Sequence, residues 1–207
     1  LLGRHLGTTD HKFLVEPLQL SVLVKELAHL LKVSLPKKCA LRFELPENVP
    51  CVDGDATQIR QVAMNLIINA AEAIADKEGA ITVSTGVCDC TRQVLSGTYV
   101  DDNLPPGRYV YLDVADTGCG MTPEVSARIF DPFFTTKFTG RGLGLAATLG
   151  IVRGHGGAIA VQSQPGRGSA FRVLLPVSTS PAPPLPAAPP PTAELHGTGT
   201  ILIVDDE

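Results

Sequence analysis

Hydrophobic and polar residues alternate along this chain in stretches that predict strands interleaved with helices. Residues 39–46 alternate with the period of two that a half-buried strand requires, and a proline ends the run. Residues 13–20 are also typical of a strand, and Ser21 could then cap a helix that continues to residue 34 with apolar residues at helical spacing. Further strands are predicted at residues 80–88, 108–116, 158–163 and 169–175.

Two more helices are predicted from apolar stripes of helical period. One begins after Asp55, a residue type that caps helices well, and runs to about residue 75. The other covers residues 143–152, and a cluster of glycines ends it. The polar stretch 90–107 contains Pro-Pro-Gly and is interpreted as a loop between antiparallel strands. Together these elements predict an α+β fold, a two-layer α/β sandwich in which a mixed sheet has helices on one face.

The chain is long enough for one domain of ordinary size with additional segments at both ends. The predicted domain covers residues 13–177. Residues 1–12 are expected to be the end of a preceding helical region and a connector, and both termini look cut from a longer polypeptide. Residues 178–199 are dominated by proline, which cannot donate a backbone hydrogen bond. An extended spacer is therefore predicted, with an SH3-type docking ligand as the alternative.

Composition disfavours several classes of function. The formal net charge is −4 and there is no tryptophan, so the basic surface and most stacking platforms of a nucleic-acid-binding protein are missing. No run of about 18 apolar residues predicts a membrane span. The five cysteines contain no CxxC pair, and Cys88 and Cys90 lack the second pair that a zinc site needs. Reduced thiols and a cytoplasmic location are therefore expected.

The helix predicted after Asp55 carries a polar stripe that is unusual for a solvent-exposed face. At about 100° per residue, its polar side chains fall within roughly 40° of one line along the helix. The stripe contains two asparagines, which are poor helix formers, and apolar residues flank it, so it would lie in a groove. An ordinary amphipathic helix with this face in water is the alternative. The polar residues are Gln58, Gln61, Asn65, Asn69 and Glu72.

The segment DTGCGM begins with Asp116 at the end of a predicted strand. This carboxylate could accept a hydrogen bond from the exocyclic amine of adenine, whereas guanine places an acceptor at that position. Gly118 and Gly120 would let the backbone turn sharply and approach the base closely. An aspartic protease would need two such segments and the chain has one. A plain turn capped by the aspartate is the other alternative.

Two further segments, FDPFFTTK and GRGLGL, would frame a glycine-bounded loop. Phe133 and Phe134 are expected to anchor this loop to the domain, and Lys137 and Arg141 supply cations for a phosphate group. The second segment precedes a predicted helix, so its backbone N–H groups would face an anion at a helix N-terminus. A dinucleotide fingerprint is excluded because no strand–helix–strand context surrounds these glycines.

The segments NLIINA, DTGCGM, FDPFFTTK and GRGLGL, in this order, resemble those of the catalytic ATP-binding domain of sensor histidine kinases. The resemblance covers roughly residues 10–177 and implies the GHKL (Bergerat) ATPase fold with a flexible ATP lid. It implies ATP and Mg²⁺ as cofactors, with Asn69 as a magnesium ligand and Asn65 beside the phosphates. Oxygen ligands suit Mg²⁺, which takes few protein ligands and leaves the other positions to water and phosphate.

Two positions distinguish this chain among the proteins that it resembles. Hydrolytic members of the fold carry a glutamate at the position of Asn65. An amide cannot accept a proton from an attacking water, so phosphoryl transfer is favoured over hydrolysis. Many sensor kinases carry Lys or His at the position of Glu72, and this carboxylate is instead a second candidate for holding the metal.

The resemblance predicts a protein-histidine kinase domain that transfers the γ-phosphate of Mg-ATP to a histidine on a separate dimerisation domain. No histidine of this chain lies in the context of that acceptor, so the acceptor is expected upstream. Relay to a receiver aspartate would follow, because residues 200–207 contain ILIVDDE, which resembles the first strand of a receiver domain. The parent protein would then be a hybrid kinase. A serine kinase of the same fold and a non-catalytic nucleotide-sensing module are the alternatives.

The expected site residues fall into three groups. The catalytic residues are Asn65, Lys137 and Arg141, and the metal ligands are Asn69 and, as an additional candidate, Glu72. The ATP-binding residues are Asn65, Asn69, Asp116, Gly118, Gly120, Lys137, Gly140, Gly142, Leu143, Gly144 and Leu145.

Overall fold

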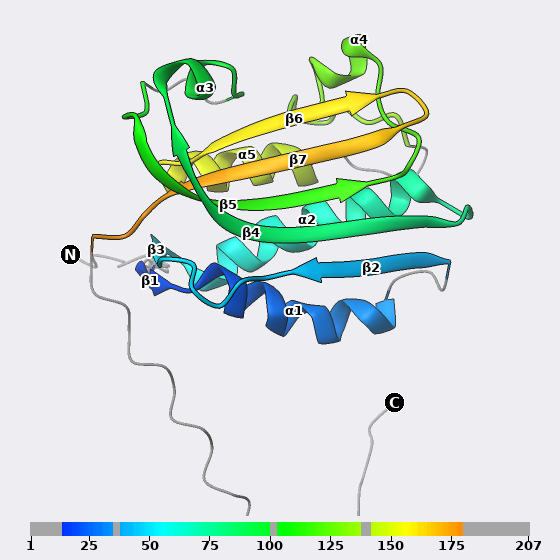
Figure 1. The fold of residues 1–207 in the computed structure, drawn as a ribbon. Helices are drawn as coiled ribbons and strands as arrows, with labels where there is room; N and C mark the ends of the chain where they lie inside the picture. The colour runs from blue at the N-terminus through cyan, green and yellow to red at the C-terminus, as the bar shows by residue number, and fades with distance from the viewer. Residues whose placement is uncertain (1–13, 35–37, 100–102, 138–141, 180–207) are drawn as a thin grey trace, which may run out of the picture.

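A five-stranded mixed sheet forms one layer of the molecule, as Figure 1 shows. Its strands are β2 (Cys39–Glu44), β4 (Gly79–Cys90), β5 (Gly107–Asp116), β6 (Ala158–Gln164) and β7 (Gly168–Pro176). They lie side by side in the order β2-β4-β5-β7-β6. β2 and β4 run parallel, and the other neighbouring pairs are antiparallel. The prediction of a mixed sheet is therefore confirmed.

This computed structural model describes residues 14–34, 38–99, 103–137 and 142–179. The predictions for residues 1–12 and 200–207, and for most of the proline-rich spacer, lie outside the described residues.

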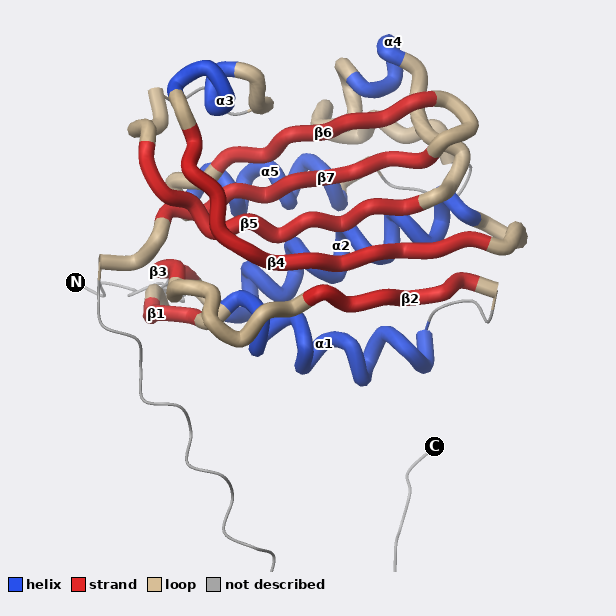
Figure 2. The backbone as a smooth tube through the Cα atoms, in the orientation of Figure 1, coloured by secondary structure: helices blue, strands red, loops and turns tan. Residues whose placement is uncertain are grey.

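Three helices cover one face of the sheet, namely α1 (Leu20–Ser34), α2 (Ala56–Ile74) and α5 (Gly144–Gly154) (Figures 1 and 2). The main hydrophobic core lies between these helices and the sheet, so the predicted two-layer sandwich is confirmed. No helix in the part of the chain that the structure describes is long and apolar enough to cross a membrane. Fully buried core residues include Leu66 and Ile67 of α2, Val83 of β4 and Val114 of β5.

α2 begins where its sequence predicts. The Asp55 carboxylate accepts hydrogen bonds from the N–H groups of Thr57 at 2.8 Å and Gln58 at 3.1 Å, which satisfies two donors of the first turn. His155, at the end of α5, supports the same turn. Its Nε2 accepts from the Asp55 N–H at 3.1 Å, so its Nδ1 donates to the Ile151 carbonyl at 2.7 Å. This imidazole therefore joins the beginning of α2 to the end of α5.

The beginning of the chain differs from the prediction. The strand expected over residues 13–20 is shorter, because only β1 (Glu16–Leu18) pairs, with the unpredicted strand β3 (Val52–Gly54). α1 begins one residue before Ser21, so this serine lies inside the first turn and is not its N-cap. Its hydroxyl instead shares a buried hydrogen bond with Thr85 Oγ1 of β4, at 2.8 Å. A buried hydroxyl needs a partner, and here that partner lies 64 residues away.

The connection between β4 and β5 is not the plain loop that its composition predicts. It contains the short helix α3 (Arg92–Ser96), whose first turn is capped by the hydroxyl of Thr91. A second small core lies beneath this connection, on the face of the sheet opposite the large helices, because neighbouring strand residues point to opposite faces. A further unpredicted turn of helix, α4 (Pro123–Ser126), follows β5. The buried members of the second core are Cys90, Leu95, Leu104, Tyr109, Ala158 and Leu174.

Candidate functional site

A cavity of about 780 Å³ lies between α2, the end of β5 and the segments that connect β5 to α5. All four sequence segments that resemble those of a kinase contribute to its lining, although the first segment lies far from the other three in the sequence. Their side chains come from a helix face, a strand end and two turns, and the lining includes Asn65, Asp116, Lys137 and Gly144.

Asn65 joins α2 to the beginning of α5. Its Nδ2 donates to the carbonyl oxygen of Gly144 at 3.2 Å and to Thr148 Oγ1 at 3.4 Å. Thr148 is fully buried and also donates to the Gly144 carbonyl, at 2.9 Å. A glutamate at position 65 would place acceptor oxygens against the same carbonyl, so this contact requires an amide. The sequence analysis missed Thr148, whose only signal is a hydroxyl four residues after Gly144 on a helix.

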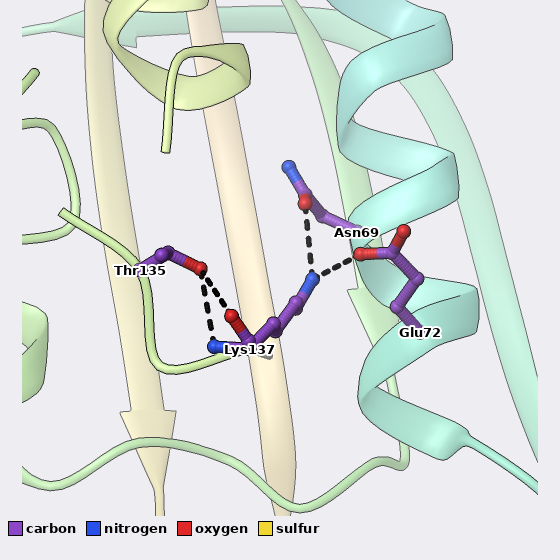
Figure 3. A network of polar contacts seen from close by, with 4 residues as sticks. All are labelled: Asn69, Glu72, Thr135 and Lys137. Atoms are coloured by element: carbon purple, nitrogen blue, oxygen red, sulfur yellow. Dashed lines mark hydrogen bonds and ion pairs between the residues drawn. The ribbon is translucent and has the colours of Figure 1, made fainter. Parts of the chain in front are cut away.

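Lys137 reaches from the segment after α4 to the polar stripe of α2, as Figure 3 shows. Its Nζ donates to Asn69 Oδ1 at 3.2 Å and forms an ion pair with the Glu72 carboxylate. Both members of the pair keep contact with water, since 38% of the Lys137 side chain and 50% of the Glu72 side chain are exposed. Two side-chain oxygen atoms on one turn of α2, from Asn69 and Glu72, therefore hold a cation. Oxygen atoms are also the ligands that Mg²⁺ prefers.

Asp116 ends β5 in another part of the cavity, and only 7% of it is exposed. Its Oδ1 accepts from the Gly118 N–H at 2.7 Å. Burial raises the pKa of this carboxyl above its ordinary value. Hydrogen bonds from the backbone of Gly118 and Ser169, and the positive charge of Lys137, oppose that shift of the pKa. A carboxylate has about four lone-pair positions. It can therefore accept from a ligand in addition to the backbone.

Close backbone contacts shape the turn that follows Asp116. Gly120 has a φ of +64°, and a Cβ there would lie 1.9 Å from the carbonyl oxygen of Gln164. Gly118 is not among the residues that line the cavity, and a Cβ there would lie 2.6 Å from the backbone of Ala73 on α2. The turn is therefore fixed against β6 on one side and against α2 on the other.

The segment before the predicted lid is attached to the beginning of α5 through its backbone. The Phe133 N–H donates to the carbonyl of Gly142 at 2.9 Å. Phe133 is 76% exposed and has a φ of +66°, so the expectation that it anchors the loop is wrong. Phe134 is half-buried and has the Arg128 guanidinium 4.5 Å from its ring centroid. The buried aromatic anchor of this segment is Phe130, which is 8% exposed.

The structure brings most of the predicted site residues together. Gly118 lies outside the lining, and Gly140 and Arg141 lie outside the described residues. Ile68, an apolar residue that flanks the polar stripe of α2, also lines the cavity. Val125 and Ile129 of the apolar lining were not predicted, because nothing in the sequence distinguishes them from core residues. The predicted residues that line the cavity are Asn65, Asn69, Glu72, Asp116, Gly120, Lys137, Gly142, Leu143, Gly144 and Leu145.

The chain belongs to the family of histidine kinase-, DNA gyrase B- and HSP90-like ATPases, which it matches over residues 54–179. The match begins at the capped turn of α2 and ends just after β7. It therefore includes every element that lines the cavity.

Sensor histidine kinases are among the relatives of this chain. It is 36% identical over 163 residues to the sensory histidine kinase/phosphatase NtrB of Rhizobium meliloti (strain 1021), a match that covers 78% of the chain. It is 34% identical over 201 residues to the sensor kinase CckA of Brucella abortus (strain 2308), a match that covers 93% of the chain. The chain spans 41% of the length of NtrB and 21% of the length of CckA.

Solved structures of histidine kinases share this fold. Full-length ShkA in complex with AMPPNP gives a TM-score of 0.64 at 25% identity, covering 85% of this chain and 34% of ShkA. The nucleotide-free catalytic domain of the histidine kinase ThkA gives a TM-score of 0.62 at 28% identity, covering 79% of this chain and 95% of that domain. The fold and the family are those of a histidine kinase ATP-binding catalytic domain.

Proposed function

We propose that this chain holds Mg-ATP and presents its γ-phosphate to a histidine on a separate dimerisation domain. The supporting observation is that one cavity has two chemically different parts. One part contains the buried carboxylate of Asp116, and another contains Asn69 and Glu72 with the cation of Lys137. These parts suit the two ends of ATP, an amine-bearing base and a polyanion that binds a divalent cation.

The adenine would bind beside Asp116. Its exocyclic amine donates to the carboxylate, whereas the carbonyl oxygen of guanine would be repelled. The apolar lining, including Val125 and Ile129, would cover the faces of the ring.

The Mg²⁺ would be held by Asn69 Oδ1, with the Glu72 carboxylate as the second candidate. These side chains lie three positions apart on α2, so both reach the same side of the helix. When bound, the ion would offset phosphate charge and orient the γ-phosphoryl group.

The phosphates would bind between Lys137 and the beginning of α5. Gly142 and Gly144 line this part of the cavity, and the N-terminus of a helix favours anions. Arg141 remains a predicted second cation on the lid.

The acceptor histidine, and not water, would supply the nucleophile. Where hydrolytic members of the fold carry a glutamate, Asn65 uses its amide to hold Gly144 and Thr148. An amide does not act as a general base. Slow hydrolysis beside transfer to a partner is the expected behaviour.

The acceptor and receiver domains would belong to a longer parent protein that works in the cytoplasm, where ATP is available. The match to CckA covers 93% of 207 residues, so it continues beyond the catalytic domain into the proline-rich segment. ThkA, which has been solved in complex with the response regulator protein TrrA, shares this fold at a TM-score of 0.59 and 26% identity. The complex of ThkA with a response regulator supports a receiver as the final phosphate acceptor.

Two measurements test the proposal. Calorimetric titration with ATP and GTP, each with and without Mg²⁺, should give magnesium-dependent binding of ATP and none of GTP. Incubation of the chain with labelled ATP and the dimerisation domain of NtrB should then place acid-labile, alkali-stable phosphate on that domain. Equal binding of GTP would contradict the role of Asp116. Tight ATP binding without transfer to any supplied acceptor would contradict the kinase assignment.

A further inference from the structure

Glu72 and Asn69 hold the ammonium group of Lys137 against α2 (Figure 3). Lys137 lies 65 residues beyond Glu72 and reaches α2 across the cavity. Its backbone is held as well, because Thr135 Oγ1 accepts from its N–H at 3.1 Å and the same hydroxyl lies 3.4 Å from its carbonyl oxygen. The lysine is thus fixed at both ends, in a position that its own turn and α2 define together.

The ammonium group of Lys137 and a bound Mg²⁺ would compete for one oxygen atom. Asn69 Oδ1 accepts from Lys137 Nζ at 3.2 Å, and the same atom is the proposed magnesium ligand. Mg²⁺ binds oxygen at about 2.0–2.1 Å and demands nearly octahedral geometry. An ammonium group bonded to the same oxygen would lie inside the first hydration shell of the ion and would repel it. The two cations therefore exclude each other at this position.

We propose that Glu72 is a positioning residue that keeps Lys137 in the magnesium position until Mg-ATP binds, and that Mg²⁺ then displaces the lysine toward the phosphates. This proposal depends on the proposed function, in particular on the metal role of Asn69. Before Mg-ATP binds, the Lys137 ammonium group offsets the charge of the Glu72 carboxylate, and after binding the Mg²⁺ would offset it. Lys137 becomes available to the nucleotide only when the metal is present. The site should therefore bind Mg-ATP tightly and free ATP weakly.

The exposure of the pair makes this exchange feasible. Half of Glu72 and more than a third of Lys137 are in contact with water. Ion pairs of this kind contribute little to stability and re-form easily with other partners. A fully buried pair would leave an uncompensated charge when one partner departs.

The test is a double-mutant cycle on the magnesium dependence of ATP binding. The quantity measured is the magnesium midpoint, which is the Mg²⁺ concentration that gives half of the full increase in ATP affinity. It is obtained by calorimetry on the full chain. Lys137→Met should lower this concentration about three- to tenfold, the range expected for coupled charges in contact. Glu72→Gln should change it little when Lys137 is present, because losing the carboxylate also releases the competing lysine. In the Lys137→Met background, Glu72→Gln should raise it.

Two variants separate exchange from a general effect of charge. Lys77→Met removes an exposed positive charge just beyond the end of α2 and should leave the magnesium midpoint unchanged. Lys137→Arg keeps the charge and should retain most of the competition. Thermal melting of each variant without nucleotide establishes that it is folded, as expected for half-exposed side chains.

The outcomes distinguish this proposal from the proposed function. Additive effects of Glu72→Gln and Lys137→Met in a chain that binds ATP in a magnesium-dependent way would overturn the exchange and leave the kinase proposal intact. An unchanged magnesium midpoint in Lys137→Met would do the same. Magnesium-independent ATP binding by the unaltered chain would overturn both.

Discussion

The part of the cavity around Asp116 and the part around Lys137 are built in contrasting ways. Asp116 is 7% exposed, and the turn after it is so tight that a Cβ on Gly120 would lie 1.9 Å from a carbonyl oxygen. Half of the Glu72 side chain and more than a third of the Lys137 side chain are exposed, and an ion pair between distant segments joins them. The part around Asp116, where adenine is proposed to bind, is therefore fixed by packing, whereas the part around Lys137 can exchange its contacts.

This contrast assigns different tasks to the two parts of the cavity in the proposed function, namely base recognition to the part around Asp116 and phosphoryl transfer to the part around Lys137. A preformed acceptor discriminates between bases because guanine would place an acceptor, and not a donor, against the buried carboxylate. Under the proposed function, the part around Lys137 would accept a metal, release a product and meet a partner, so contacts that are easily replaced suit it. Substitutions near Asp116 should thus change stability or base affinity, and substitutions near Lys137 should change magnesium dependence and transfer.

The largest expected effect is that of Asn69→Ala on phosphoryl transfer. Loss of the amide oxygen removes the proposed protein ligand of Mg²⁺, so transfer to a supplied acceptor domain should fall on the order of 1,000-fold. Gln61→Ala is the matched control, because Gln61 belongs to the same polar stripe but does not line the cavity. Transfer by Asn69→Ala at more than about a tenth of the unaltered rate would contradict its role as a metal ligand.

The second prediction concerns the rigidity of the turn after Asp116. Gly120→Ala should lower the free energy of unfolding by at least about 3 kcal/mol, because it adds a backbone clash to a positive φ. Gly166→Ala is the control, since Gly166 has a φ of +76° but nothing within 4 Å of its Cβ position. It should cost only about 1–2 kcal/mol. Chemical denaturation measures both, and equal losses would show that strain, and not packing, fixes this turn.

The third prediction is that Asp116→Asn weakens ATP binding without weakening the fold. In Asp116→Asn the amide oxygen can still accept from the Gly118 N–H, so the NH₂ group would face the adenine amine, which is also a donor. Calorimetry should show an affinity loss of about 10- to 100-fold. The pKa of Asp116 is raised in the folded state, so the charged form opposes folding at neutral pH, and the melting temperature should not fall.

The pH profile provides the control for this variant. Because the pKa of Asp116 is raised, its stabilising contribution is fully present below the ordinary pKa of aspartate and is lost as the pH rises through the folded-state pKa. ATP binding has the opposite dependence, since it needs the carboxylate. Affinity should therefore decrease as the pH falls toward that pKa in the unaltered chain, and should stay nearly constant in Asp116→Asn. Identical profiles would assign the titration to another group.

Sequence reasoning succeeded where the determining interactions are local. Asp55 caps α2 through donors two and three residues later, so the residue type alone predicts the helix start. The polar stripe of α2 follows from helical periodicity, and its Asn65 and Asn69 do line the cavity. The strands of the main sheet were predicted within about two residues of their ends.

It failed where distant segments decide the outcome. Ser21 has the composition of an N-cap, but its hydroxyl is used by a threonine 64 residues away. The pairing of Lys137 with Glu72 joins positions 65 residues apart, and no local pattern encodes it. Phe133 adopts a positive φ that its residue type disfavours, because its N–H bonds the carbonyl of Gly142. Such contacts follow from the assembled fold.

The smallest expected effect tests whether the connection between β4 and β5 influences the cavity. Tyr99 in this connection donates its hydroxyl proton to the Ser126 carbonyl at 2.6 Å and packs edge-on against Phe130 at 4.7 Å. It thereby supports α4, whose Val125 lines the cavity. Tyr99→Phe should cost about 0.5–1 kcal/mol of stability, because the ring contact remains and solvent partly replaces the lost bond. Tyr99→Ala should cost about 1 kcal/mol more, because the aromatic contact is also lost.

Neither variant should change ATP affinity or the magnesium midpoint by more than about twofold, since the effects of residues without shared partners are nearly independent. Tyr99 lies outside the lining of the cavity and contacts neither Asp116 nor Lys137 among its described partners. A larger change in magnesium dependence would mean that α4 transmits the state of this connection to the cation-binding part. The adjustability assigned to Lys137 and Glu72 would then belong to a wider unit that includes α3 and α4. A larger change in base affinity alone would instead show that the packing around Asp116 is less rigid than its contacts indicate.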